Sequence, residues 1–173
     1  MKNKNIFLIG PQGAGKTTIG RQLAKTAHLV FYDSDQEIER QTGVSITTIF
    51  EFEGELGFRK REEEMVAKLT TLENIVLSSG GGTILSASNR QALANNGTVI
   101  YLRASLDTQL ERTNQRKGVR PLLNTRDPFK KIIELDTTRA PLYEEIANYI
   151  YDTDIHPPKS IADQIFEQLF NKG

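Results

Sequence analysis

A glycine-rich segment near the start of the chain has the residue types that bind phosphate groups. The stretch GPQGAGKT, residues 10–17, fits the pattern G-x-x-x-x-G-K-[ST] and stands between an apolar run and a helical pattern. In such a segment, successive backbone N–H groups and a helix N-terminus form an anion site. The Lys16 ammonium can reach the β- and γ-phosphates of a nucleotide, and the Thr17 hydroxyl can ligate Mg²⁺. We therefore predict a nucleotide-phosphate site rather than a plain turn that caps a helix.

Two carboxylates, Asp33 and Asp35, follow the second apolar run of the chain. Many P-loop proteins place an aspartate at the end of another apolar strand, but the run at 75–79, IVLSS, ends in serines. Residues i and i+2 of an extended segment point the same way, and open α/β sheets bind ligands at the carboxyl ends of their strands. We predict Asp33 near the water shell of Mg²⁺ and Asp35 on an acceptor hydroxyl. The structural alternative stays open, because Ser34-x-x-Glu37 is a capping box and Asp33-x-x-Gln36 is nearly one.

Three arginines stand in settings that suit an anionic ligand. Arg59 precedes glutamates at i+3 and i+4, so it could equally form ion pairs on a solvated helix face. Arg139 lies two residues before Pro141, which predicts a position near a break in a helix, where it could instead contact terminal carbonyls. Arg120 lies in the polar, basic segment 113–124, from which an arginine could stabilise a transferring phosphoryl group.

Gly80, Gly81 and Gly82 follow the apolar run at 75–79 directly. Inside regular structure each glycine would cost about 0.5–1 kcal/mol relative to alanine, so three in a row need a reason. Either they form a plain turn, or they let a ligand approach the backbone closely.

Short β-rich runs alternate with longer helical patterns along the chain, which favours a parallel α/β sheet. The predicted strands are 5–9, 29–32, 75–79, 98–102 and 149–152, and the predicted helices include 16–27, 86–97, 105–113 and 158–170. The pair Asn96-Gly97 is typical of a helix C-cap.

Two segments interrupt this alternation. Residues 34–72 are helix-like with no strand, and residues 113–124 are polar and broken by glycine and proline. Insertions of this kind often bind substrate or cover a site. We predict acceptor-binding helices over 34–72 and a lid over 113–124, within one domain that spans 1–173.

Composition excludes several classes of protein. Lys plus Arg and Asp plus Glu both number 22, so no net charge steers the chain to nucleic acid or to a membrane. The chain has no cysteine, which excludes disulfides and thiolate metal sites and favours a reducing compartment. No apolar run is long enough for a signal peptide or a membrane span. We expect a cytoplasmic protein.

The motifs GAGKTT, DSDQEIE, GFRKREE, GGGT, RPLL and RAPLY occur in this order. Together they closely resemble the shikimate kinase family over nearly the whole chain. The resemblance implies ATP-dependent phosphorylation of the 3-hydroxyl of shikimate in aromatic amino-acid biosynthesis. It also implies a five-stranded parallel sheet of order 2-3-1-4-5, flanked by helices, and a mobile lid. We expect the enzyme to be a monomer.

The same resemblance implies roles for individual residues. Lys16, Asp35 and Arg120 are expected to be catalytic, with Thr17 a direct Mg²⁺ ligand and Asp33 a ligand through water. The expected ATP contacts are Gly13, Ala14, Gly15, Lys16, Thr17, Thr18, Arg112, Arg120 and His156. The expected shikimate contacts are Asp35, Arg59, Gly80, Gly81, Gly82 and Arg139, with the glycines letting backbone N–H groups meet the ring. Around His156 the segment DTDIHPPK diverges from relatives, so a backbone contact is expected there rather than a specific side-chain role.

Two other functions compete with this interpretation. A small P-loop kinase for gluconate or a nucleotide would share the phosphate loop, and gluconate is also an anionic polyol. A P-loop switch or binding module without catalysis would lack the acceptor residues, yet Lys16, Asp35 and Arg139 are all present. The combination of DSD, FRxxE and RAPLY favours shikimate.

Overall fold

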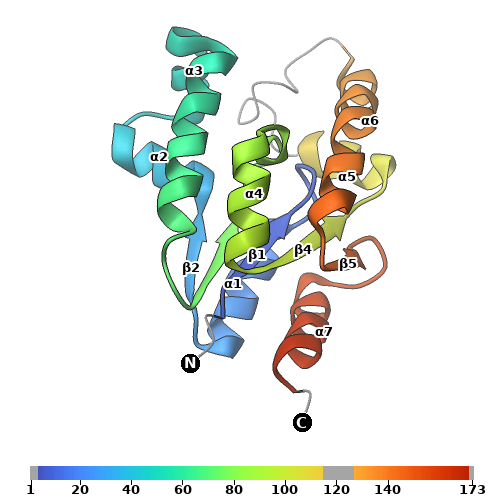
Figure 1. The fold of residues 1–173 in the computed structure, drawn as a ribbon. Helices are drawn as coiled ribbons and strands as arrows, with labels where there is room; N and C mark the ends of the chain where they lie inside the picture. Colours follow the sequence, from blue (N-terminus) through green and yellow to red (C-terminus); the bar gives the residue numbers. More distant parts are fainter. Residues whose placement is uncertain (1–3, 115–126, 172–173) are drawn as a thin grey trace.

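A five-stranded parallel sheet forms the centre of the molecule, in a computed structural model that describes residues 4–114 and 127–171 (Figure 1). The strand order is β2-β3-β1-β4-β5, and every neighbouring pair is parallel. The order that the family resemblance implied is thus confirmed. The strands are β1 (Ile6–Ile9), β2 (Val30–Asp33), β3 (Ile75–Ser78), β4 (Thr98–Arg103) and β5 (Tyr149–Asp152).

Each strand lies within one residue of the range predicted from the sequence, because parallel strands covered on both faces must be apolar throughout. The central strand β1 shows this best. Ile6 and Leu8 join one hydrophobic cluster, while Phe7 and Ile9 join a second cluster on the opposite face of the sheet.

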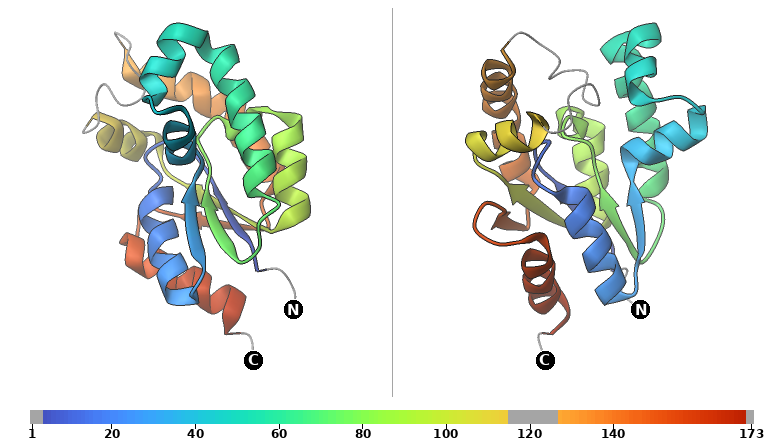
Figure 2. Two further views of the ribbon diagram at one scale, coloured as in Figure 1. Left: turned by 90° about the vertical axis from the view of Figure 1, so that its left-hand side faces the viewer. Right: turned by 180° about the vertical axis from the view of Figure 1, so that it is seen from behind.

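Helices cover both faces of the sheet, as the two further views show (Figure 2). The first cluster packs under α1 and α7, and the second packs under α3, α4 and α6. The helices are α1 (Lys16–Ala27), α2 (Ser34–Thr42), α3 (Ile46–Leu69), α4 (Ala87–Asn96), α5 (Leu106–Asn114), α6 (Pro128–Ile146) and α7 (Pro158–Phe170), and a short 3₁₀ helix, η1, spans Thr83–Leu85.

The predicted helical insertion 34–72 consists of α2 and α3. Their packing places a long helical arm beside the β2 edge of the sheet (Figure 1). Gly54 interrupts α3 with φ 70° and ψ −179°, so the helix is kinked there. The predicted lid, 113–124, falls largely outside the described residues.

The helix C-cap predicted at Asn96-Gly97 is confirmed, because α4 ends at Asn96 and Gly97 is its C-cap residue, with extended backbone at φ −174° and ψ −174°. The lack of a side chain there serves close packing, because a Cβ would come within 2.8 Å of the Asn5 carbonyl oxygen. The helix break expected near Pro141 is wrong. Helix α6 continues through Pro141 to Ile146, which leaves Arg139 inside the helix.

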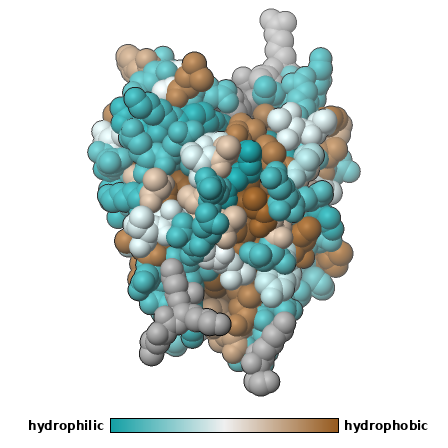
Figure 3. All heavy atoms as spheres, in the orientation of Figure 1, coloured by the Kyte–Doolittle hydropathy of each residue, from teal (hydrophilic) through white to brown (hydrophobic). Residues whose placement is uncertain are grey.

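The surface seen over α3, α4 and α6 mixes hydrophilic and hydrophobic residues, with apolar side chains showing between α4 and α6 (Figure 3). Within the described ranges, no helix combines the length and apolar character needed to cross a membrane.

Candidate active site

The phosphate-binding segment forms a tight loop between the end of β1 and the start of α1. Gly13 and Gly15 have φ values of 85° and 88°, in the left-handed region that glycine adopts most easily. Lys16 Nζ donates to the carbonyl oxygens of Gly10 and Pro11 at 2.7 and 2.8 Å. The ammonium is therefore held inside the curve of the loop, where the N-terminus of α1 also favours an anion.

The Thr17 hydroxyl joins this loop to the end of β2. It donates to Asp33 Oδ2 at 2.8 Å. The other oxygen of Asp33 accepts from the backbone N–H groups of Asp35 and Gln36 at 3.0 and 3.1 Å, so Asp33 also caps α2. The capping interpretation is thus confirmed, with Asp33 rather than Ser34 as the capping residue, and the role of Asp33 near Mg²⁺ stays a prediction.

Asp35 is not on an extended segment, contrary to the prediction. Because Asp33 caps the helix, Asp35 lies in the first turn of α2. Burial, together with the negative charges of Glu62 and Asp33, raises the pKa of Asp35 from its usual 3.8 to about 7, although Lys16 and Arg59 act in the opposite direction. Its Oδ1 is buried and has no hydrogen-bond partner among the described residues. The site thus holds an acid whose proton is readily exchanged near neutral pH.

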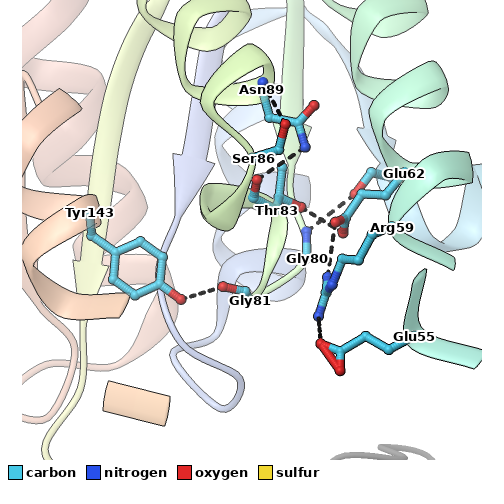
Figure 4. A network of polar contacts seen from close by, with 10 residues as sticks. Glu55, Arg59, Glu62, Gly80, Gly81, Thr83, Ser86, Asn89 and Tyr143 are labelled. Carbon is cyan, nitrogen blue, oxygen red and sulfur yellow. Dashed lines mark hydrogen bonds and ion pairs between the residues drawn. The ribbon is translucent and has the colours of Figure 1, made fainter. Parts of the chain in front are cut away.

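Arg59 forms ion pairs with two glutamates of α3, the exposed Glu55 and the buried Glu62 (Figure 4). Its Nη1 lies 2.9 Å from Oε1 of Glu62, whose side chain is only 1 % exposed. The other oxygen of Glu62 accepts from the Thr83 hydroxyl at 2.9 Å, and Asn89 donates to the Thr83 carbonyl at 3.0 Å. This chain of contacts fixes the Arg59 guanidinium against η1 and α4.

The three glycines at 80–82, called here the triple-glycine loop, leave room for functional side chains. A Cβ on Gly80 would lie 3.1 Å from Oδ1 of Asp35, and a Cβ on Gly82 would overlap the Arg59 guanidinium. Neither glycine has a positive φ in this structure. The loop is therefore glycine because the neighbouring side chains approach its backbone closely.

Arg139 reaches the same loop from α6. It is 4 % exposed, and its Nη1 would lie 3.4 Å from a Cβ on Gly81. Burial lowers the pKa of Arg139, and the positive charge of Arg59 acts in the same direction. The two guanidinium groups, 80 residues apart in the chain (139 − 59), thus converge on one loop.

The expected ATP contacts beyond the phosphate loop are Arg112, His156 and Arg120, and the structure describes the first two. Arg112 Nη1 donates to the Gly13 carbonyl at 2.6 Å, and its Nη2 donates to the Thr153 carbonyl at 3.2 Å. This links α5 and the end of β5 to the phosphate loop. His156 is exposed. Arg120 lies outside the described residues.

A cleft of about 930 Å³ connects these groups. Gly13, Lys16, Thr17 and Thr18 line it at the phosphate loop, Asp35 and Arg59 line it at the other end, and Arg112 and His156 also contribute. Arg139 instead lines a small neighbouring cavity of about 20 Å³, with Gln12 lining both spaces.

Sequence reasoning missed three residues that build the site. Glu62 was noticed as an ion-pair partner and as part of the FRxxE motif, but its burial had no local signal. Tyr143 has a weak signal, since it follows Arg139 by four residues and so shares its helix face. Thr83 belongs to the GGGT motif, but the sequence did not show its contact with Glu62, because Glu62 comes from a distant helix.

Comparison with known proteins gives one consistent family. A family model described as shikimate kinase matches residues 12–170. A shikimate kinase of Methylococcus capsulatus is 51% identical, with 100% of this chain and 97% of that protein covered. A shikimate kinase of Alteromonas mediterranea is 50% identical, with 97% and 98% covered.

Solved structures agree. A shikimate kinase from Acinetobacter baumannii in complex with shikimate has a TM-score of 0.95 at 45% identity, covering 99% of this chain and 96% of that one. A sugar kinase from Janibacter sp., at 17% identity and a TM-score of 0.58 with 98% and 95% covered, shares only the fold.

Proposed function

The chain belongs to the shikimate kinase family, and we propose that its site transfers the γ-phosphoryl group of ATP to the 3-hydroxyl of shikimate. The family supplies the reaction, which is phosphorylation of shikimate with ATP as donor. The geometry described above supports a role for each group of residues.

At the acceptor end, Arg59 and Arg139 would hold the carboxylate of shikimate. Planar guanidinium groups pair with both oxygens of a carboxylate at once, and two of them converge on the triple-glycine loop. Glycine at this loop also lets backbone N–H groups approach the ring. Asp35, which lines the same cleft, would accept a hydrogen bond from the reacting hydroxyl.

At the donor end, the loop N–H groups and the N-terminus of α1 would bind the phosphates. The Thr17 hydroxyl and the Asp33 carboxylate, joined at 2.8 Å, supply the oxygen donors that Mg²⁺ prefers, with Thr17 as the direct ligand and Asp33 acting through water. When bound, Mg²⁺ neutralises charge on the phosphates.

Phosphoryl transfer depends mainly on the placement of the reacting groups and on stabilisation of negative charge. The acceptor oxygen bonds to the γ-phosphorus while the bond to the bridging oxygen breaks, and ADP leaves. Lys16 stabilises negative charge on the transferring group, and Asp35 takes the proton of the acceptor hydroxyl. Position matters more than base strength, because a loose transition state demands little of a base.

Three further assignments extend this proposal toward the nucleotide. Arg112, anchored on the Gly13 carbonyl, would stack beside the adenine. His156 at the rim of the cleft would contribute only through its backbone. Arg120 would meet the phosphates from the lid, and this assignment rests on the family motif RPLL alone.

The observation that carries the proposal is the convergence of Arg59, Arg139 and Asp35 on one glycine loop across a cleft from Lys16. A non-catalytic nucleotide module would not need these acceptor groups. A gluconate kinase would also bind an anion, but no specific observation favours it.

The experiment is an ADP-release assay with Mg-ATP and a panel of acceptors comprising shikimate, quinate, gluconate and nucleoside monophosphates. We expect efficient turnover with shikimate only. Turnover with gluconate or a nucleotide that exceeds turnover with shikimate would refute the proposal.

We also propose that the protein works as a cytoplasmic monomer that binds neither nucleic acid nor membrane. The balanced charge fits the lack of nucleic-acid and membrane binding, and the lack of cysteine fits a reducing compartment. Light scattering of the purified protein, with and without substrates, tests the monomer; a stable dimer would contradict it.

A further inference from the structure

Tyr143 lies beneath the acceptor site and has no role in the assignments above. It is 1 % exposed and stands one helical turn after Arg139 on α6. Its hydroxyl donates to the Gly81 carbonyl of the triple-glycine loop (Figure 4). Its ring packs against Tyr101, with ring centroids 5.0 Å apart. The buried Tyr143 ring thus places its hydroxyl against the triple-glycine loop, which Arg139 also approaches.

The same hydroxyl interacts with Arg139. Arg139 and Tyr143 line the same small cavity beside the triple-glycine loop, and the Tyr143 proton goes to the Gly81 carbonyl. Burial raises the pKa of Tyr143, which keeps the hydroxyl protonated as a donor. The Tyr143 hydroxyl therefore anchors the Gly81 carbonyl at the place where the Arg139 guanidinium approaches the loop.

Anchoring this carbonyl also orients an N–H group. In a trans peptide the Gly81 carbonyl and the Gly82 N–H point in opposite directions. Because the carbonyl points to Tyr143 on α6, the Gly82 N–H points away from α6, and Gly82 lines the large cleft. Within the described residues, no group accepts a hydrogen bond from this N–H.

The other loop contacts do not fix this peptide. The Gly80 N–H donates to the Ser34 hydroxyl at 3.2 Å, and the Gly80 carbonyl accepts from the Thr83 N–H at 3.1 Å. These bonds hold the two preceding peptides, Ser79–Gly80 and Gly80–Gly81. The Gly81–Gly82 peptide depends on Tyr143, since glycine itself restricts backbone rotation less than any other residue.

We propose that Tyr143 is a positioning residue, whose hydroxyl anchors the triple-glycine loop beside the Arg139 guanidinium so that loop and guanidinium meet the acceptor in one fixed arrangement. The inference rests on the proposed function, because it takes shikimate as the molecule that the two groups hold. Its energetic basis is preorganisation, since groups held in place before binding lose less freedom when the ligand arrives.

The test is Tyr143→Phe, with Tyr101→Phe as the matched control. Both changes remove one oxygen from neighbouring buried rings, but within the described residues the Tyr101 hydroxyl has no hydrogen bond to lose. We expect Tyr143→Phe to raise KM for shikimate about fivefold, the effect of one neutral hydrogen bond, with KM for ATP unchanged. Tyr101→Phe should change neither KM.

A change in KM for shikimate without a change in KM for ATP distinguishes a positioning role of Tyr143 from a general role in stability. A purely structural role would lower Tm and raise both KM values together, and that result would overturn the inference, as would an unchanged KM for shikimate. A measurement on the wild type does not depend on the variant folding. The Tyr143 hydroxyl proton should exchange with water far more slowly than that of the partly exposed Tyr149, and equal exchange would also overturn the inference.

If the proposed function is wrong, the experiments give a different result from the one expected when only the role of Tyr143 is wrong. If the wild type does not phosphorylate shikimate at all, the function is wrong and the KM comparison does not apply. The amide resonance of Gly82 then tests the anchor directly. It should shift in Tyr143→Phe and stay unchanged in Tyr101→Phe, and an unchanged resonance in both variants would overturn the inference by itself.

Discussion

The Arg59 guanidinium occupies the space that a side chain on Gly82 would need. Its Cζ and Nη1 both lie 2.5 Å from the position that a Cβ would take. Gly82 has φ −94°, which any residue can adopt, so backbone freedom does not explain this glycine. The absent side chain instead makes room for a guanidinium that Glu62 holds from the other side.

Gly82→Ala should therefore damage acceptor binding more than stability. The overlapping atoms are the end of a flexible side chain, so Arg59 can move away and the fold survives. The cost is a misplaced guanidinium, and we expect KM for shikimate to rise at least about tenfold, as when a charge-assisted hydrogen bond is lost. Steady-state kinetics should show KM for ATP unchanged, and Tm should fall little. An unchanged KM for shikimate would mean that Arg59 does not bind the acceptor from its present position.

Lys16→Met should remove most of the turnover. The ammonium is held by the carbonyls of Gly10 and Pro11, at the place where negative charge would develop during transfer. Loss of one such preorganised group costs about 10²-fold or more in kcat. Lys25→Met is the matched control, because Lys25 is exposed on the last turn of the same helix. Near wild-type kcat in Lys16→Met would show that the phosphate loop is wrongly assigned.

The sequence predicted the sheet well because the strands of this fold carry local signals. The all-buried run Ile6–Ile9 and the glycine-lysine pattern that follows it are readable without knowledge of any contact. The strand order came from the family resemblance, since periodicity does not specify which strands are neighbours. The unbroken helix across Pro141 goes against local preference, which favours a break there, whereas the kink at Gly54 falls on a glycine with φ 70° and is a local feature.

The candidate site was predictable only in part for the same reason. Asp33 and Asp35 were recognised, but their geometry was wrong, because a single cap at Asp33 turns the following residue pair into helix. Glu62 looked like one of several solvated acids until α3 packed it against Thr83. Burial is set by the partner element, so a motif can identify a charged residue without showing whether that charge meets solvent.

Asp35 should impose a pH dependence on catalysis. Its pKa is raised from 3.8 to about 7, mainly by burial, and the charged form is the one that accepts a proton. We therefore expect kcat/KM for shikimate to fall as pH falls through about 7, by roughly tenfold per pH unit below it. A profile that stays flat down to pH 5 would contradict this. Glu62 raises the same pKa, so Glu62→Gln should move the midpoint to lower pH.

The raised pKa of Asp35 predicts that the folded protein becomes more stable when this carboxylate is removed. Between pH 3.8 and about 7 the folded state keeps the proton that the unfolded state has lost, so stability falls as pH rises through this window. Asp35→Asn should abolish most turnover, because an amide cannot take the proton. It should also raise Tm above the wild type at pH 8, with the difference shrinking toward pH 4. Thermal unfolding at several pH values checks this, and a lower Tm at pH 8 would show that the carboxylate is stabilised in the folded state.

Arg139→Lys tests whether a planar guanidinium, rather than a positive charge alone, holds the acceptor. Arg139 is buried inside α6 and converges with Arg59 on the triple-glycine loop, an arrangement suited to pairing with both oxygens of a carboxylate. Lysine keeps the charge but offers no fork, so shikimate binding should weaken by about 1–3 kcal/mol, while ATP binding stays unchanged. Arg103→Lys serves as the control, because Arg103 makes an exposed pair with Asp152. Calorimetry measures both affinities.

The ligand can be changed instead of the protein. The methyl ester of shikimate lacks the negative charge but keeps the ring and its hydroxyls. If the two arginines bind the carboxylate, the wild type should lose affinity for the ester, and Arg139→Lys should lose little more. Such non-additivity is expected only when the two changes remove the same interaction. If the ester is phosphorylated as efficiently as the free acid, the arginines hold some other part of the acceptor.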